Sequence, residues 1–306
     1  MSLPPSLDGK KALVTGASGF IGSRLCERLL ERRAEVHGVS RSPQTSTVMR
    51  WSSTDVSDSE KMLALIRDAK PDFIFHLASH VSGSRGLDAV LPTFHTNLLS
   101  AVNVLLAAAE VGCSRVVLAG SLEEPGTEDR QPVPVSPYAA AKSAASAYGR
   151  MFESLYDVPV VTLRIFMVYG PGQRDETKLV PYVITSLLRG EAPALSSGTR
   201  PVDWIYVDDV VDALIASVTT EAVVGETVDV GSGVLTPIRS VVEGIVDLIG
   251  PSVEPRFGAL PDRPNERVRV ADVERTRALL DWTPRTPLEE GLSATVDWYA
   301  ARKDAA

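Results

Sequence analysis

The sequence predicts a protein of the α/β class, with a doubly wound parallel sheet and a smaller C-terminal α/β lobe. Two patterns support this fold class. A glycine-rich turn separates a short apolar stretch at 10–15 from an amphipathic segment at 23–33. Apolar stretches and amphipathic segments then alternate as far as residue 165, as in chains that build parallel sheets. A chain of 306 residues is long enough for one large domain or two unequal ones.

The first half of the chain contains the regular alternation. Buried strands are expected where apolar residues run together, and helices where apolar residues recur every three or four positions. The predicted strands are 10–15, 34–40, 48–51, 71–79, 114–120 and 158–166, and the predicted helices are 23–33, 61–70, 96–111 and 137–155.

The second half is less regular and predicts most of the smaller lobe. Asp208 or Asp209 is the expected N-cap of a helix that ends near residue 217. The other predicted elements are a loop at 167–178, helices at 179–189, 238–249, 272–281 and 287–302, a short strand after residue 203, a last strand of the main sheet at 226–233 and a strand at 254–257. We therefore assign 1–165 plus about 203–232 to the main domain, and about 166–202 plus 233–306 to the smaller lobe.

Composition excludes several classes of protein. The net charge of −8 disfavours nucleic acid and anionic membranes as partners. No apolar run approaches the length that spans a bilayer, and the N-terminal residues lack the apolar core of a signal peptide. Cys26 and Cys113 are expected to be reduced core thiols, and neither these nor the four histidines have metal-site spacing. We expect a cytoplasmic protein without a metal.

The turn after the first strand predicts a dinucleotide site. Gly16, Gly19 and Gly22 lie in the stretch TGASGFIG, between a strand and a helix. Such a turn brings backbone N–H groups and the positive end of a helix to a pyrophosphate. The alternative is an ordinary tight turn, but the strand before it and the helix after it favour the cofactor site. The predicted contacts from this turn are Gly16, Ser18, Gly19, Phe20, Ile21 and Gly22.

The end of the second strand indicates which cofactor binds. Ser40 stands where an acidic residue is expected if the ribose hydroxyls of NAD are held, and Arg41 follows it. A guanidinium can pair with the 2′-phosphate of NADP, so we expect NADP to be preferred, with NAD also able to bind. The alternative is that Arg41 is a solvated loop charge. Further predicted cofactor contacts are Asp55 and Val56 beside the adenine, and Leu77, Ala78 and Ser79 at the end of a buried strand.

A hydroxyl, a phenol and an amine form the candidate catalytic set. Ser121 ends a predicted strand, and Tyr138 and Lys142 are four residues apart on a helix that Pro137 can open. A lysine ammonium near a phenol lowers the phenol pKa toward neutrality, which suits proton transfer to a carbonyl or carbinol oxygen. Ser121 can hold the same oxygen by a hydrogen bond. Taken alone, Tyr-x-x-x-Lys could be an ordinary helix pair, and the glycine turn makes the catalytic interpretation stronger.

These motifs together resemble the extended short-chain dehydrogenase/reductase family, the NAD(P)-dependent epimerases, dehydratases and reductases of nucleotide sugars. The resemblance covers nearly the whole chain through TGASGFIG, HLAS, SPYAAAK, YGPGQ, YVDDVV and DRPNE, in that order. It implies a Rossmann-type cofactor domain, a C-terminal substrate lobe, a cofactor contact at Asn97, and catalytic roles for Ser121, Tyr138 and Lys142. It also implies a homodimer formed through the helices at 96–111 and 137–155.

Within that family the reaction stays open. The segment GSLEEPG resembles that of 4-keto-6-deoxymannose reductases, so we expect reduction of a 4-keto group on a nucleotide-linked sugar. Glu123 falls where 4,6-dehydratases carry a catalytic glutamate, although the neighbouring Leu122 supplies no acid. The alternatives are a 4-epimerase or 4,6-dehydratase without net redox change, and a non-catalytic dinucleotide sensor.

The expected substrate contacts depart from the family pattern. Met167 stands where the family has an asparagine, and Val202 where it has an arginine, so Arg263 is left for a diphosphate, with Arg200 as a substitute. Glu123 and Glu124 could face the substrate or form a solvated loop pair. The predicted substrate-binding residues are Ser84, Glu123, Glu124, Met167, Arg200 and Arg263.

Overall fold

The computed structural model describes residues 7–125, 133–250, 253–263 and 266–303. The chain forms two compact units. The first comprises Met1–Ile165, Val211–Asp229 and Glu274–Trp282, and the second comprises Phe166–Val210, Val230–Val273 and Thr283–Ala306. The predicted division agrees with these units up to residue 165. It differs at 203–210 and 230–232, which belong to the second unit, and at 274–282, which belongs to the first.

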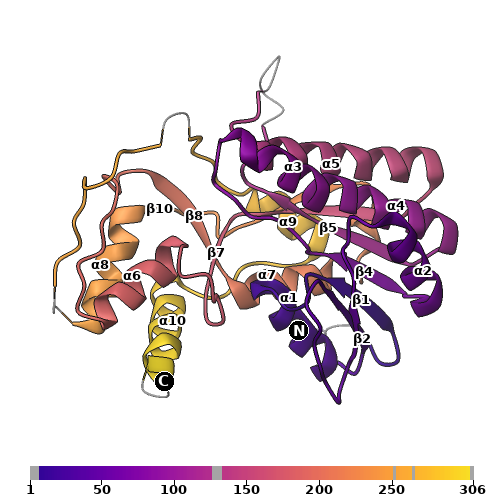
Figure 1. Cartoon of the computed structure of the whole chain (residues 1–306), viewed down its shortest axis with the longest axis horizontal. Helices are drawn as coiled ribbons and strands as arrows, with labels where there is room; N and C mark the ends of the chain where they lie inside the picture. The colour runs from indigo at the N-terminus through magenta and orange to yellow at the C-terminus, as the bar shows by residue number, and fades with distance from the viewer. Residues whose placement is uncertain (1–6, 126–132, 251–252, 264–265, 304–306) are drawn as a thin grey trace. The chain divides into compact units, whose positions relative to one another are not determined.

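The first unit is built on a seven-stranded sheet with the order β3-β2-β1-β4-β5-β6-β9 (Figure 1). Its strands are β1 (Lys11–Thr15), β2 (Glu35–Ser40), β3 (Arg50–Ser53), β4 (Phe73–His76), β5 (Arg115–Ser121), β6 (Val160–Ile165) and β9 (Thr227–Val230). All pairings from β3 across to β6 are parallel. The chain leaves β1 in one direction through β2 and β3 and returns to β4, so the predicted doubly wound sheet is confirmed.

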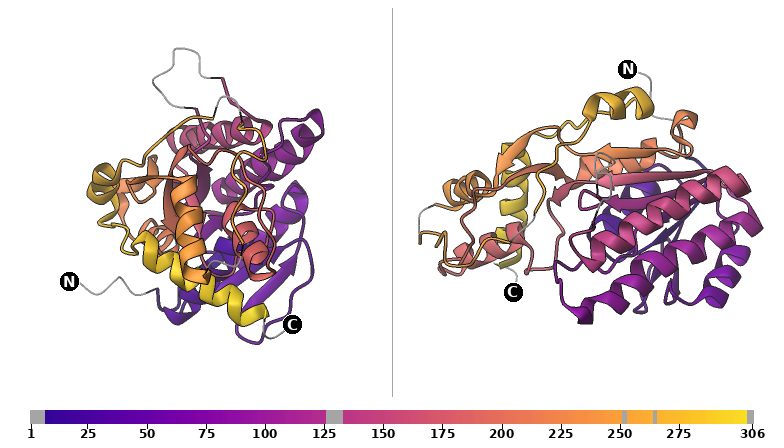
Figure 2. Two further views of the ribbon diagram at one scale, coloured as in Figure 1. Left: turned by 90° about the vertical axis from the view of Figure 1, so that its left-hand side faces the viewer. Right: turned by 90° about the horizontal axis from the view of Figure 1, so that it is seen from above.

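Helices cover both faces of this sheet. The helices of the unit are α1 (Phe20–Glu31), α2 (Ser59–Ala69), α3 (Val90–Thr93), α4 (Ser100–Val111), α5 (Pro137–Tyr156), α7 (Val207–Ala216, which continues from the second unit) and α9 (Val273–Leu280), with short helical turns η1 (Leu87–Ala89), η2 (Phe94–Leu99) and η3 (Glu221–Val223). On one face α4 packs against both α2 and α5 (Figure 2, right). Elsewhere Arg28 of α1 pairs with Asp212 of α7 at 3.1 Å.

The helical segment that contains Asn97 is longer than predicted. It begins at Leu87 and includes a π-helical turn, η2, so helical residues run continuously to Val111. Of the described helices, this one alone is long and apolar enough to cross a membrane by length and composition, which the sequence analysis did not anticipate. Val104 and Leu105 on its inner face are fully buried in the core of the first unit, as in the core helix of a globular protein.

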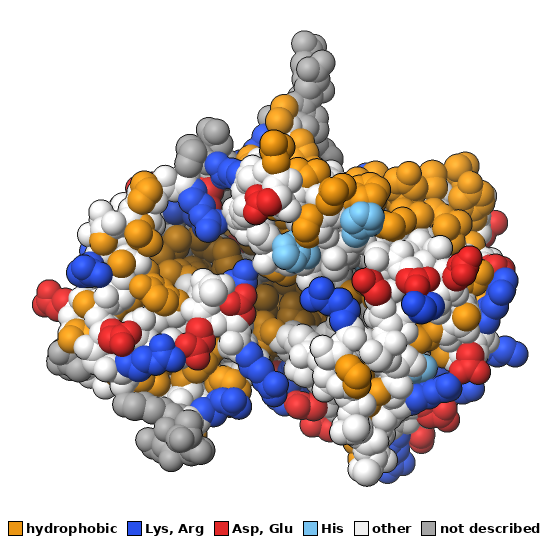
Figure 3. All heavy atoms as spheres, viewed as in Figure 1, with side chains coloured by type: hydrophobic (Ala, Val, Ile, Leu, Met, Phe, Trp, Pro, Cys, Tyr) orange, Lys and Arg blue, Asp and Glu red, His pale blue; other side chains and the backbone are white. Residues whose placement is uncertain are grey.

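Apolar side chains are also exposed along the outer surface of α3, α4 and α5. Figure 3 shows apolar side chains gathered over α4 and α5. The large exposed apolar residues of this surface are Leu87, Val90, Leu91, Phe94, Leu106, Tyr148, Leu155 and Tyr156. A contiguous apolar surface of this kind is typical of a protein interface.

The second unit contains a three-stranded sheet with the order β10-β8-β7. Its elements are β7 (Met167–Tyr169), α6 (Leu179–Leu188), β8 (Pro201–Tyr206), β10 (Leu235–Pro237), α8 (Ile238–Ile249) and α10 (Leu288–Lys303). β7 lies in the segment predicted as a loop, because its three residues pair with β8. The strand predicted at 254–257 is wrong: Arg256 makes only a single bridge, to Ala194.

Two buried aspartates organise the loops of the second unit. Asp203 in β8 accepts hydrogen bonds from the backbone N–H groups of Ser232, Gly233 and Ala271, at 2.7, 3.0 and 2.9 Å. Asp209 accepts backbone hydrogen bonds from Arg285 and Thr286, both at 3.0 Å. The predicted N-cap is therefore wrong, since α7 begins at Val207 and Asp209 holds a distant loop instead.

Candidate active site

The glycine turn lies against the end of β4. Gly16 has a φ of +69°, and a Cβ atom there would come within 2.8 Å of the backbone nitrogen of Ala78. A Cβ on Gly22 would lie 2.2 Å from the carbonyl oxygen of Gly16. Gly19 is the N-cap of α1 with no side-chain cap, and the first turn of the helix has no acidic residue. This arrangement fits the diphosphate of a dinucleotide, because backbone N–H groups and the helix end meet an anion without a competing carboxylate.

A buried chain of hydrogen bonds joins the turn to β4 and α4. The hydroxyl oxygen of Thr15 lies 2.8 Å from Nδ1 of His76 and accepts the Ala78 N–H at 3.2 Å. Nε2 of His76 lies 3.0 Å from the hydroxyl of Ser100, which donates to the carbonyl of Thr96 at 2.5 Å. Because Ser100 uses its proton there, Nε2 carries the imidazole proton and Nδ1 accepts from Thr15.

His76 is therefore held as a neutral base. Burial, together with a smaller contribution from the charge of Lys142, lowers the pKa of His76 to about 3. His76 was not among the predicted site residues, because the four histidines lack metal-site spacing and no other role was assigned to them. The available signal was its place at the end of a buried strand, two residues before Ala78.

Ser40, Arg41 and Asp55, which are predicted to contact the adenosine, lie at or near the carboxyl ends of β2 and β3. Ser40 is buried and its hydroxyl donates to the Ser42 carbonyl at 2.5 Å, while Arg41 is exposed. Asp55 is exposed, and its pKa is lowered by hydrogen bonds from Ser57, with a smaller contribution from the Arg41 charge. Arg41 thus carries its charge close to the strand end. The neighbouring Val56 is buried.

Asn97 holds the loop after β4 in place. Its side-chain oxygen accepts hydrogen bonds from the Ser79 hydroxyl at 3.2 Å and the His80 N–H at 2.7 Å. Its amide donates to the His80 carbonyl at 3.2 Å. The π-helical turn η2 contains Asn97, and such turns are frequent at functional sites. Ser84, further along the same loop, is exposed.

The structure brings Ser121, Tyr138 and Lys142 together. Ser121 ends β5, and its hydroxyl lies close enough to the Tyr138 phenol to lower the pKa of that phenol. Ser136 caps α5 by accepting the Ala139 N–H at 3.0 Å, so Tyr138 and Lys142 lie in the first turns of the helix. The ammonium nitrogen of Lys142 is 5.8 Å from the centroid of the Tyr138 ring.

The protein groups do not lower the pKa of Tyr138 as predicted. Burial raises the pKa of Tyr138 to about 12, and the charges of Glu123 and Glu124 add to this rise against the hydrogen bonds of Ser121 and Ser79. Burial also lowers the pKa of Lys142 to about 8, which Glu124 opposes. The phenol is thus protonated at neutral pH. The physical reason is that desolvation of a buried phenolate outweighs the nearby ammonium.

The two glutamates after Ser121 differ in their surroundings. Glu123 is exposed, and its Oε2 accepts a hydrogen bond from the Ser136 hydroxyl at 3.2 Å. Glu124 is only 4% exposed, so the expected solvated pair is not what the structure contains. Its carboxylate accepts the Ser121 N–H at 2.7 Å and the Ser146 hydroxyl at 2.9 Å, which differs from the predicted substrate contact.

In the second unit, the two arginines predicted to meet a diphosphate share one carboxylate. Arg200 Nε lies 2.8 Å from Glu266 Oε2, and Arg263 lies 3.9 Å from Glu266 Oε1. The Arg200 contact is an ion pair but lacks hydrogen-bond geometry. Met167 is half-buried in β7.

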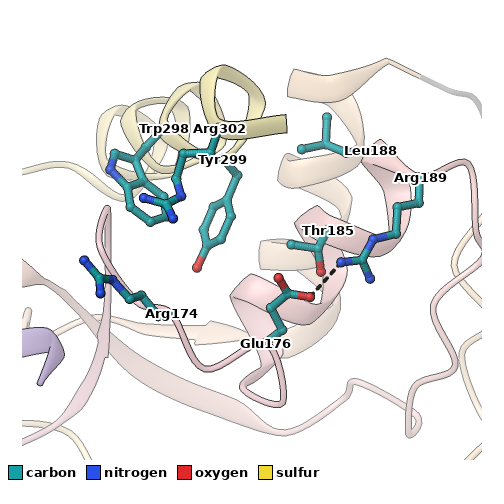
Figure 4. Close-up of a pocket in the computed structure, with 8 residues that line it drawn as sticks. All are labelled: Arg174, Glu176, Thr185, Leu188, Arg189, Trp298, Tyr299 and Arg302. Atoms are coloured by element: carbon teal, nitrogen blue, oxygen red, sulfur yellow. Dashed lines mark hydrogen bonds and ion pairs between the residues drawn. The ribbon is translucent and has the colours of Figure 1, made fainter. Parts of the chain in front are cut away.

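The second unit also carries a cavity of about 400 Å³ that the sequence analysis did not anticipate (Figure 4). Arg189 in its wall pairs with Glu176 at 2.9 Å, and the guanidinium of Arg302 lies 4.7 Å from the Trp298 ring. Among the described residues, neither Arg174 nor Arg302 is in an ion pair with a carboxylate. The cavity is lined by Arg174, Glu176, Thr185, Leu188, Arg189, Trp298, Tyr299 and Arg302.

Comparison with known proteins identifies the family. The sequence profile of the NAD dependent epimerase/dehydratase family matches residues 12–231. The chain belongs to this family. The UDP-glucose 4-epimerase of Mycolicibacterium smegmatis is 33% identical over 94% of this chain and 98% of its own length. The dTDP-glucose 4,6-dehydratase of Xanthomonas campestris is 28% identical over 94% of this chain and 92% of its own.

Solved structures of family members match nearly the whole chain. The UDP-glucose 4-epimerase of Thermotoga maritima, determined with UDP-glucose, has a TM-score of 0.87 and 26% identity, covering 97% of this chain and 100% of its own. The UDP-glucuronic acid 4-epimerase of Bacillus cereus, determined with UDP-glucuronic acid and NAD, has a TM-score of 0.85 and 26% identity, covering 95% and 99%. The chain is thus an extended short-chain dehydrogenase/reductase.

The neutral state of His76 predicts a dependence of stability on pH. Its pKa is about 3 in the folded chain, against about 6.5 when exposed, so the unfolded chain binds one more proton between these values. Stability is therefore unaffected above pH 6.5 and is lost as pH falls. Between pH 7 and 5 the loss from this residue is about 2 kcal/mol.

Urea unfolding of the wild type and of His76→Gln at both pH values measures this contribution. The glutamine can keep one donor and one acceptor but does not titrate. We expect the wild type to lose about 2 kcal/mol more than the variant on acidification. Equal losses in the two proteins would show that His76 is not held neutral.

Proposed function

We propose that the chain is an NAD(P)-dependent 4-epimerase of a nucleotide-linked sugar. The observation that carries the proposal is the convergence of Ser121, Tyr138 and Lys142 at the carboxyl edge of the sheet, where Gly16 meets Ala78. Relatives and solved structures named as UDP-glucose 4-epimerases support it. When bound, the nicotinamide supplies the hydride acceptor and donor, which no side chain provides.

The residues have separate roles in this proposal. Tyr138 is protonated at neutral pH in the free chain, so it must release this proton to solvent before it can accept the proton of the C4 hydroxyl. The ammonium of Lys142 stabilises the phenolate in this step. The phenol that then forms returns its proton to the carbonyl oxygen at C4 when the sugar is reduced on its other face. Ser121 holds the substrate oxygen by a hydrogen bond.

Epimerisation needs fewer groups than dehydration. Loss of water across C5 and C6 requires a base for the C5 proton and an acid for the C6 hydroxyl. Glu123 is an exposed carboxylate whose charge raises the pKa of Tyr138, so it lies near the proposed catalytic set. A carboxylate at this place could serve as the base, and this favours a 4,6-dehydratase as the second candidate. Its neighbour Leu122 cannot supply the acid, and Glu124 is buried. The 4-keto reduction predicted from the sequence uses the same Ser121, Tyr138 and Lys142, and remains a further outcome of the test.

The substrate contacts follow from the charges of the second unit. Arg200 and Arg263 are proposed to bind the diphosphate. In doing so they would give up their contacts with the shared partner Glu266. Arg174, in the cavity of Figure 4, is a further guanidinium that can meet an anion. Ser84, Glu123 and Met167 remain proposed contacts for the sugar.

The fate of hydrogen at C4 distinguishes the candidate reactions. With UDP-glucose or dTDP-glucose that carries deuterium at C4, we expect the label to remain at C4 of an epimerised product in the NMR spectrum. A 4,6-dehydratase would move the label to C6. A 4-keto reductase would leave both of these sugars unchanged, and would consume NAD(P)H in proportion to the product formed when a nucleotide-linked 4-keto sugar is supplied instead. Tight cofactor binding without turnover would identify a sensor.

Tyr138→Phe tests the proton-transfer role directly. We expect turnover to fall by ~10²–10⁴ while cofactor affinity is kept, because only the hydroxyl is lost. Tyr156→Phe, an exposed tyrosine on the same helix, is the matched control and should keep wild-type turnover. Wild-type turnover in Tyr138→Phe would refute the assignment.

Arg41 is proposed to give a preference for NADP(H). Its charge lies near the end of β2, and a charge-assisted hydrogen bond contributes roughly 1.5–3 kcal/mol, or about 10–150-fold in affinity. We expect NADP(H) to bind at least about tenfold tighter than NAD(H), less so at high salt. Arg41→Ala should remove most of the difference, and Arg33→Ala, at another exposed arginine, should not. Equal affinities in the wild type, by direct titration, would contradict the preference.

The exposed apolar surface of α4 and α5 is proposed to form a homodimer interface. Leu106 of α4 is 54% exposed and Tyr148 of α5 is 41% exposed. We expect a dimer mass at micromolar concentration in sedimentation experiments, and a monomer mass for Leu106→Glu. Leu248→Glu, at a leucine of α8 that is 45% exposed, is the control and should remain dimeric. A monomeric wild type would rule out this interface.

A further inference from the structure

The buried carboxylate of Glu124 has a role that the catalytic set does not explain. Glu124 is 4% exposed, and its two oxygens bind different elements. Oε1 accepts the backbone N–H of Ser121 at 2.7 Å, at the end of β5. Oε2 accepts the hydroxyl of Ser146 at 2.9 Å, on α5. A carboxylate so far from solvent is costly unless a positive charge compensates it.

The compensating charge is the ammonium of Lys142, which lies one turn before Ser146 on α5. Tyr138, Lys142 and Ser146 are spaced four residues apart, so they share one face of α5. Lys142 is 5% exposed, and its ammonium donates to the carbonyl of Ala119 at 2.7 Å. Lys142 and Glu124 therefore hold the same three-residue end of β5, one through the carbonyl of Ala119 and the other through the N–H of Ser121.

Gly120, between those two anchoring residues, leaves room for the carboxylate. A Cβ atom at Gly120 would lie 2.6 Å from Oε1 of Glu124. Any larger residue would push the carboxylate away from the Ser121 N–H. The strand end is thus shaped to take a carboxylate at this position.

We propose that Glu124 is a positioning residue that keeps the buried ammonium of Lys142 protonated and fixes Ser121 for the reaction. It acts through Lys142 and Ser121 and does not contact substrate. The inference rests on the proposed function, because it assigns a charge state to a member of the same catalytic set.

The electrostatics of the surrounding groups agree with this role. Burial lowers the pKa of Lys142 to about 8, and the charge of Glu124 raises it. The other titratable groups that interact with Lys142 or Tyr138 are His76 of β4, which is neutral, and Glu123, which acts on Tyr138. With a neutral side chain at 124, burial of Lys142 is no longer opposed, so its pKa must fall.

The pKa of Lys142 can be measured without turnover. The chain contains seven lysines, so ¹³C labelling at lysine Cε gives few NMR signals, and Lys142→Met identifies the one of interest. We expect Glu124→Gln to lower the pKa of Lys142 by at least one unit, a tenfold change in its dissociation constant. Ser146→Ala removes the hydrogen bond but keeps the carboxylate, so the pKa should stay near the wild-type value. The same pKa in the wild type and in Glu124→Gln would overturn the proposal.

The pH profile of turnover gives the second measurement. The alkaline limb of kcat should move to lower pH in Glu124→Gln and should return toward the wild type in Glu124→Asp, which restores a carboxylate. A uniform loss of kcat at every pH, with an unmoved limb, would mean that Glu124 only supports the fold. Because the NMR titration needs no substrate, a wrong assignment of the reaction would not affect it. Circular dichroism confirms that each variant is folded.

Discussion

The site depends on the requirement that polar groups buried at the carboxyl edge of the sheet find partners there. Thr15, His76 and Ser100 satisfy one another across β1, β4 and α4. Thr15 also accepts a hydrogen bond from the Ala78 N–H. This series of hydrogen bonds therefore holds the loop after β4 against the glycine turn. The close approach at Gly16, where no Cβ atom fits, follows from that contact. A buried group without its partner would cost of the order of 1–3 kcal/mol, so each member constrains the next.

Burial at this edge of the sheet determines the protonation state of each titratable side chain. His76 is kept neutral, Tyr138 is kept protonated, and Lys142 has a pKa near 8. Anionic Glu124 and cationic Lys142 both bind backbone groups of the last residues of β5, which also carries Ser121. The protonation state of Tyr138 therefore depends on the balance of charges in a poorly solvated region, more than on the intrinsic acidity of the phenol.

The second unit presents a different electrostatic arrangement. Arg200 and Arg263 share Glu266, so the positive charge available to a diphosphate is smaller than the number of arginines suggests. Asp203, beside Val202 in β8, accepts backbone hydrogen bonds from residues 232, 233 and 271 with its two carboxylate oxygens. The departures from the family pattern therefore lie among the proposed substrate contacts, while Ser121, Tyr138 and Lys142, the proposed catalytic set, are kept.

The sequence by itself determined the order of strands and helices in the first unit, the glycine turn and the Ser121, Tyr138 and Lys142 set. These features depend on local periodicity and on spacing within one turn or one helix, which a single sequence displays. The tertiary structure decided the short pairing of β7 with β8, the place of Asp209, the neutral state of His76 and the burial of Glu124. Each of these depends on partners more than 20 residues away, and on desolvation, which exists only once the chain is packed. For that reason the spacing of Tyr138 and Lys142 was predicted correctly, and the direction of the Tyr138 pKa shift was not.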